Sequence, residues 1–149
     1  MGPMTRTPQV RSRALLGLVA VGLTLLLTAC LNSGQQRMVD LVNRDRGANG
    51  RAALAVDDEL VAKAQAWAEK MARDGRLSHS NLRDGVTSCW RSLSENVAVS
   101  SSVDGLHRAW MASSGHRANI LAPSSTHIGV GVVRQGDRYW GVQVFRQAC

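Results

Sequence analysis

The sequence has no acidic residue before Asp40 and no run of basic residues longer than two. Three of its 18 Lys and Arg residues lie within the first thirteen positions, so the rest of the chain carries 15 basic and 11 acidic groups, a formal charge of +4. A nucleic-acid-binding surface needs clustered basic residues interleaved with aromatic ones. We therefore expect no nucleic acid among the partners. A length of 149 residues favours one domain with its own core, which we expect to be a monomer.

Cysteine is also sparse. The chain has three, Cys30, Cys89 and Cys149, and no CxxC pair of the kind that indicates a structural zinc module. If Cys30 is modified as described below, an even pair remains, and in an oxidising compartment this pair predicts a Cys89–Cys149 disulfide. The alternative is two buried or reactive thiols.

No apolar run is long enough to cross a bilayer comfortably. Residues 14–29 are sixteen uncharged, mostly apolar residues that follow three arginines. A span needs about 20 such residues, whereas this pattern is typical of a signal peptide. Leu27-Thr28-Ala29-Cys30 resembles the bacterial lipobox, in which the cysteine is lipidated and becomes the mature N-terminus.

These features predict a lipoprotein signal peptide over residues 1–29, the lipidated Cys30 with a short tether over residues 30–36, and a domain over residues 37–149. We expect the domain to be extracytoplasmic and anchored to the cell membrane by lipid. The alternative is an ordinary signal peptide or a poor transmembrane anchor with an incidental cysteine.

The remaining chain reads as helices followed by strands. Helical periodicity predicts helices over Gln35–Arg46 and Asp57–Gly75. In the second, Asp57 can cap the start and Gly75 is a natural C-terminal residue. Its expected buried face consists of Leu60, Ala64, Trp67 and Met71. A third helix is predicted from about Ser102, with a break near Gly115.

After Pro123 the apolar period changes to two, which indicates strands. HIGVGVV alternates from Ile128 and YWGVQVF from Trp140, with a hairpin turn at Gly136-Asp137 between them. ENVAV, residues 95–99, is a plausible third strand. The predicted class is α+β, with helices packed on a small antiparallel sheet.

Three polar residues stand where this scaffold does not need them: His79 after the long helix, Glu95 at the start of a strand, and His116 after Gly115. Each also has an ordinary structural explanation, and no local spacing links them. Two histidines and one carboxylate are ligands that suit a zinc-class divalent ion. His107, flanked by Leu106 and Arg108, is expected at the surface, and the role of His127 stays open.

Five segments, in this order, resemble the CAP superfamily of cysteine-rich secretory, antigen 5 and pathogenesis-related proteins, and particularly its compact bacterial branch. They are LSHSN, SENVA, HRAWMASSGHRANIL, HIGVGVV and YWGVQVF. The resemblance implies an α-β-α sandwich with a central cleft, in which His79 and His116 hold a divalent ion and Glu95 is the carboxylate. It places Ser80, Asn96 and Ser113 along the cleft.

The chain departs from the family pattern at two positions. Ser94 replaces a glycine before the glutamate, and Ser113 stands where many eukaryotic members carry a second glutamate. The loss weakens any two-carboxylate acid–base mechanism, since Glu95 is the one candidate left. Trp110, Arg117 and Asn119 are expected to be structural, the last two by bracing neighbouring segments through hydrogen bonds to the backbone.

Three functions compete. The first is a non-catalytic envelope module that binds a metal ion and an unknown ligand or protein partner in its cleft. The second is a metal-dependent hydrolase of peptides, esters or glycans, with Glu95 or a histidine as general base. The third is a purely structural domain. The sequence favours the first and leans away from an enzyme.

Overall fold

The computed structural model describes residues 1–2 and 30–149, so the predicted signal peptide lies almost wholly outside the described residues. The helices are α1 (Ser33–Ala48), α2 (Asp58–Asp74), α3 (Val103–Ala112) and α4 (Ser114–Ile120). The strands are β1 (Ala55–Val56), β2 (Trp90–Ser100), β3 (His127–Gln135) and β4 (Arg138–Ala148). None of the described helices has the length and apolar character needed to cross a membrane.

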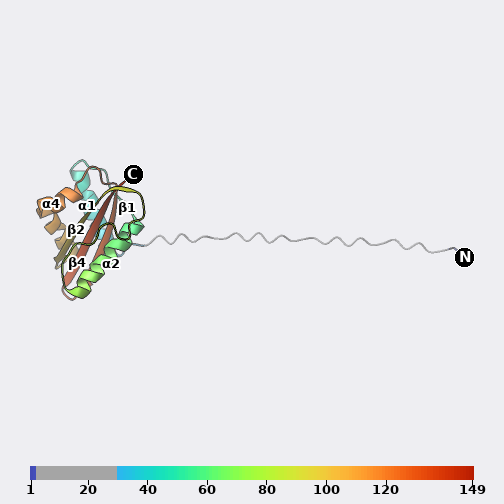
Figure 1. Cartoon of the computed structure of the whole chain (residues 1–149), viewed down its shortest axis with the longest axis horizontal. Helices are drawn as coiled ribbons and strands as arrows, with labels where there is room; N and C mark the ends of the chain where they lie inside the picture. The colour runs from blue at the N-terminus through green and yellow to red at the C-terminus, as the bar shows by residue number, and fades with distance from the viewer. Residues whose placement is uncertain (3–29) are drawn as a thin grey trace.

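The sheet is the middle layer of a three-layer sandwich (Figure 1). The helices α1, α3 and α4 bury Met38, Trp110 and Ile120 on one face of the sheet, together with Val130 and Phe145. Helix α2 covers the other face, where Leu60, Ala64 and Met71 pack against Val142 and Val144. The α-β-α arrangement predicted from the sequence is confirmed.

The sheet is mixed rather than purely antiparallel, with the strand order β1-β3-β4-β2. β3, β4 and β2 are antiparallel neighbours, whereas β1 pairs in parallel with β3 through Ala55–His127 and Val56–Ile128. A strand of two residues leaves no period in the sequence, which is why it was not predicted. β2 is also longer than the expected residues 95–99 and begins at Trp90.

Helix α1 starts earlier than predicted. Asn32 caps it, and a capping box joins the Asn32 side chain to the Gln35 N–H and the Gln35 side chain to the Asn32 N–H. The helix therefore includes Ser33 to Gln36, residues that were expected to be tether, and only Leu31 and Asn32 separate Cys30 from it.

Two glycines allow α2 to lie directly on β3. A Cβ on Gly129 would come within 2.1 Å of the Leu60 backbone, and one on Gly131 within 2.2 Å of the Ala64 backbone. The Gly alternation in GVGV thus gives β3 one flat face for the helix and one apolar face for the core.

The outer edge of β3 is closed beyond β1 by two glutamine side chains. Gln35 Nε2 donates to Val130 O at 3.0 Å, and the Val132 N–H donates to Gln65 Oε1 at 3.1 Å. Gln35 Nε2 also donates to Gln65 Oε1 at 3.1 Å, which joins α1 to α2 across the strand. Unpaired strand edges invite pairing with other chains, and these bonds remove that possibility at this edge.

A buried arginine and a buried histidine fasten the helical layer. The Arg46 guanidinium is 1% exposed and donates to four backbone carbonyls, those of Ala52, Ile120, Ala122 and Ser125. His107 is 3% exposed, and its Nε2 lies 2.8 Å from Asp45 Oδ2. The prediction of a surface His107 is wrong, because Val103, His107 and Trp110 share the inner face of α3 at i, i+4 and i+7.

Candidate functional site

Glu95 is the centre of the site. It lies in β2, its side chain is 2% exposed, and its carboxylate accepts three hydrogen bonds. His79 Nδ1 is 2.8 Å and the Ser80 N–H 2.9 Å from Oε1, and Ser80 Oγ is 2.5 Å from Oε2. Since Oε1 also accepts from a backbone N–H, the His79 Nδ1 is the donor in this pair. The tautomer that results leaves the Nε2 lone pair of His79 free, on a side chain that is 60% exposed.

His116 reaches the same region from the opposite layer, in the first turn of α4. Its backbone carbonyl accepts a bond of 3.1 Å from Asn96 Nδ2, which also donates to Gln143 Oε1 at 3.0 Å. Asn119 Nδ2 donates to Asn96 Oδ1 at 2.9 Å and to Glu95 O at 3.4 Å. These bonds tie α4 to β2 through Asn119, and Asn96 is fully buried in the network rather than exposed along a cleft.

The two histidines are close enough to influence each other. Burial lowers the pKa of His116 below its usual 6.5, and the charge of His79 lowers it further. The neutral imidazole that results is the form that binds metal ions. Nevertheless, no three His, Cys, Asp or Glu side chains in the described part of the chain are grouped so that they could hold a metal ion. The structure bonds Glu95 to His79 and places His116 within reach of the charge of His79, with Glu95 behind His79 rather than beside its free nitrogen.

The segment that carries His79 and Ser80 is fastened along α2. Trp67 Nε1 donates to Ser78 O at 2.8 Å. One helical turn earlier, Lys63 Nζ donates to the carbonyls of Asn81 and Asp84 at 2.7 and 2.8 Å. A groove of 520 Å³ remains between α2 and this segment, and Ser80 lies in its wall. A segment held at several points can keep His79 in place without belonging to a helix or strand.

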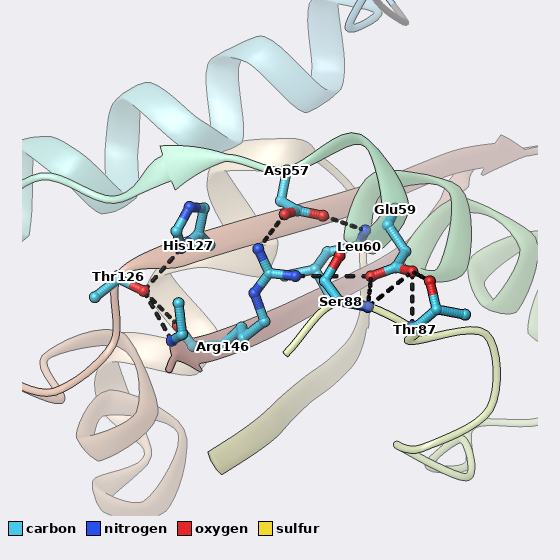
Figure 2. Close-up of polar contacts among 9 residues, drawn as sticks. Asp57, Glu59, Leu60, Thr87, Ser88, Thr126, His127 and Arg146 are labelled. Carbon is cyan, nitrogen blue, oxygen red and sulfur yellow. Dashed lines mark hydrogen bonds and ion pairs between the residues drawn. The ribbon is translucent and has the colours of Figure 1, made fainter. Parts of the chain in front are cut away.

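Figure 2 shows the last of these fastenings, at the N-terminus of α2. Glu59 accepts hydrogen bonds from the Thr87 hydroxyl, the Thr87 N–H and the Ser88 N–H. The Thr87 bonds, with help from Ser88, lower the pKa of Glu59 to about 2. Arg146 of β4 pairs with the cap residue Asp57, and its Nη1 lies 3.6 Å from Glu59 Oε2.

The predicted disulfide is confirmed next to this cluster. Cys89 and Cys149 are bonded, with their Cα atoms 5.6 Å apart and a separation of 60 positions in sequence. The bond joins the start of β2 to the end of β4. His127 bonds through Nδ1 with Thr126 Oγ1 at 2.8 Å, so the histidine left open by the sequence belongs to this end of the sheet and not to the Glu95 site.

The other predicted residues have mixed outcomes. Trp110 is fully buried in the core, as expected. Arg117 is exposed, and its guanidinium makes no hydrogen bond or ion pair to any described residue, so its predicted bracing role is wrong. Ser113 precedes α4 without a side-chain capping bond. Cys30 is an exposed free thiol.

Three residues of the site region were missed in the sequence. Gln143 is fully buried beside Asn96, and Lys63 and Trp67 hold the His79 segment. Gln143 is out of phase with Trp140, Val142 and Val144, so the sequence pattern placed it on the outward face, whereas the helical layer in fact buries it together with Phe145. Lys63 and Trp67 carried no signal, because their partners are backbone carbonyls of a loop.

The comparisons with known proteins come from one family. The sequence model of the Cysteine-rich secretory protein family, CAP, matches residues 39–145. The chain belongs to the CAP family. The five segments that resemble the family in sequence all lie within this matched region, and the fold described above is the CAP fold.

Three relatives illustrate the range of this similarity. Uncharacterized protein YkwD of Bacillus subtilis (strain 168) is 31% identical over 112 residues, which cover 69% of this chain and 44% of that protein. An extracellular protein containing a SCP domain from Bacillus anthracis strain Ames has a TM-score of 0.69 at 24% identity, over 80% of this chain and 45% of that one. NaASP2, whose crystal structure was determined with Zn²⁺, has a TM-score of 0.61 at 15% identity, over 80% of this chain and 85% of that one.

Proposed function

We propose that this CAP domain is a non-catalytic, extracytoplasmic binding module that holds a divalent metal ion with His79 and His116 and recruits a ligand beside it. The observation that carries the proposal is the bonded set Ser80–Glu95–His79. A buried carboxylate that orients a histidine and leaves its Nε2 exposed is the arrangement that prepares an imidazole for a metal ion.

The residues present fit such an ion as two ligands rather than three. Glu95 uses both carboxylate oxygens for His79 and Ser80, so its role is to fix the tautomer and the orientation of the His79 ring. His116 supplies the second neutral imidazole. When bound, the ion would offer open coordination positions to a ligand. NaASP2 with Zn²⁺ makes zinc the first ion to test.

The hydrolase alternative gains less support. A general base must be free to accept a proton from water or substrate, and both oxygens of Glu95 are already occupied. The structural alternative is supported by the bonds that tie Glu95 to the His79 segment. It does not explain why the oriented histidine is 60% exposed.

Three observations support a location outside the cytoplasm. The Cys89–Cys149 disulfide is typical of an oxidising compartment. The Bacillus anthracis neighbour is named as extracellular. Cys30 is exposed and lies two residues before the cap of α1, so a lipid on Cys30 would hold the domain next to the membrane.

Zinc calorimetry and metal analysis of the full chain test the proposal. We expect one ion per chain, lost in His79→Ala and in His116→Ala. His127→Ala is the matched control, since His127 lies on β3, two strands across the sheet from Glu95 on β2. No uptake of zinc, manganese or copper by the wild-type chain would refute the metal site and favour the structural alternative.

Membrane attachment is tested separately by Cys30→Ser. The variant is expected in the soluble fraction, and continued attachment would favour the transmembrane anchor instead.

A further inference from the structure

The second edge of the sheet is formed by β2, and within residues 30–149 no strand lies beside it. The hydrogen bonds of the first edge determine which backbone groups of β2 point outward. Val130 O and the Val132 N–H of β3 bond to glutamine side chains, so these two residues face away from β4. Gly131 between them therefore faces β4, where Val142 is its partner.

The same alternation carries through β4 to β2. Because Val142 faces β3, Gln143 and Phe145 face β2, and their partners there are Asn96 and Ser94. Leu93 and Glu95, in the alternate positions of β2, consequently turn their backbone N–H and C=O groups to the outside. In the part of the chain that the structure describes, one hydrogen bond reaches these groups, the bond of 3.4 Å from Asn119 Nδ2 to Glu95 O.

A pocket of 300 Å³ lies along this part of the edge. It is lined by Leu82, Arg83, Trp90, Ser92 and Leu93. Leu82, Trp90 and Leu93 are partly exposed apolar residues, and the Arg83 guanidinium lies 5.9 Å from the centre of the Trp90 ring. The pocket contains no acidic residue, and the neighbouring Arg91 is exposed.

We propose that an extended acidic polypeptide segment binds as an added strand along β2 at Leu93–Glu95, with an aliphatic side chain in the pocket and a carboxylate beside Arg83 or Arg91. A row of unpaired backbone groups at strand spacing is complementary to another strand. The pocket favours an aliphatic side chain, and its positive charge favours an acidic neighbour.

The added strand passes the metal-binding candidates, because Glu95 lies on the open edge and is also the partner of His79. The inference rests on the proposed function to this extent: it names the class of ligand that the binding module recruits. Binding to the edge itself uses backbone groups and requires no metal ion.

Amide hydrogen exchange of the full chain tests the proposal, with the capped peptide Ac-Glu-Val-Thr-Val-Glu-amide as probe. At about 1 mM peptide and a Kd of about 0.1 mM, exchange at Leu93 and Glu95 is expected to slow about tenfold. The same peptide with N-methylated valines is the matched probe, because it keeps the side chains and loses backbone donors. It is expected to slow neither amide.

Two variants of the chain separate backbone from side-chain binding. Leu93→Pro removes an outward N–H that the ladder does not use, so slowing at Glu95 should disappear. Leu93→Ala keeps the N–H and should weaken the effect without abolishing it. If Leu93→Pro does not fold, the two peptides still decide the question on the wild-type chain.

Three results would overturn the proposal: no slowing at about 1 mM peptide, equal slowing by the N-methylated peptide, or a dimer in light scattering that already protects Leu93 and Glu95 without peptide. Peptide protection in a wild-type chain that takes up no zinc would refute the metal site alone. Zinc uptake without peptide protection would refute this inference alone.

Discussion

The two edges of the sheet differ in how far their outward backbone groups are hydrogen-bonded. At the β3 edge, the segment of β1 bonds the carbonyls of Thr126 and Ile128, and Gln35 and Gln65 bond the Val130 carbonyl and the Val132 N–H. At the β2 edge, the outward backbone groups of Leu93 and Glu95 accept or donate one hydrogen bond within the described residues, the bond from Asn119 Nδ2 to Glu95 O. The candidate site is built on the second edge, so we assign a stabilising role to the closed edge and propose binding for the open one.

The disulfide should have the largest effect, because it holds the open edge to the rest of the sheet. Cys149→Ser is expected to lower the free energy of unfolding by about 4 kcal/mol in the chain-entropy account of a sixty-residue loop. Urea denaturation measures this. The wild-type chain under reducing conditions should have the same free energy of unfolding as the variant. A loss below about 1 kcal/mol would show that residues 30–149 do not depend on the disulfide for their stability.

Gln35→Ala reopens the closed edge. It removes the bond to Val130 O in a buried position and part of the capping box, so we expect a loss of about 2 kcal/mol, the cost of an unsatisfied buried group. Gln36→Ala is the matched control on the exposed side of the same turn, where the amide bonds only Asp40. Equal effects of the two variants in urea denaturation would contradict the distinction between the edges.

As the pH falls, the segment before β2, which is held by Glu59, should lose stability before the closed edge does. The pKa of Glu59 is lowered from 4.5 to about 2, so its contribution to stability is present above pH 4.5 and is lost as the pH falls toward 2. Glu59→Gln should remove this part of the acid transition and cost about 1 kcal/mol at pH 7. Stability curves from pH 7 to 2 test this, with Asp58→Asn as the control.

The smallest effect is expected from His116. Its lowered pKa means that the unfolded chain binds a proton more readily than the folded one, so stability declines as the pH falls through about 6.5. His116→Gln should flatten the stability curve between pH 7 and 5 by a few tenths of a kcal/mol. An unchanged slope would show that His116 titrates as it does in the unfolded chain.

The sequence predicted what is local and missed what is paired at long range. The helix cap at Asp57, the left-handed Gly75 and the alternation of β3 and β4 were all predicted, because each depends on neighbours in sequence. The predicted strand began at Glu95, whereas β2 begins at Trp90. The first half of β2 contains Arg91, Ser92 and Ser94, which are typical of a polar loop. An open edge has no buried period to recognise.

The sequence singled out His79, Glu95 and His116 but not the contacts between them. The hydrogen bond of Glu95 to His79 depends on Ser80 and on the loop held by Lys63 and Trp67. The closing of the other edge depends on Gln35 and Gln65, which are polar residues on helices with nothing local to mark them.

Amide hydrogen exchange of the peptide-free chain tests the contrast between the edges most directly. The Val132 N–H is held by Gln65 on the closed edge, whereas the Leu93 N–H faces outward on the open one. Our account predicts that Leu93 exchanges at least about 100-fold faster than Val132. Equal protection of the two amides would contradict it.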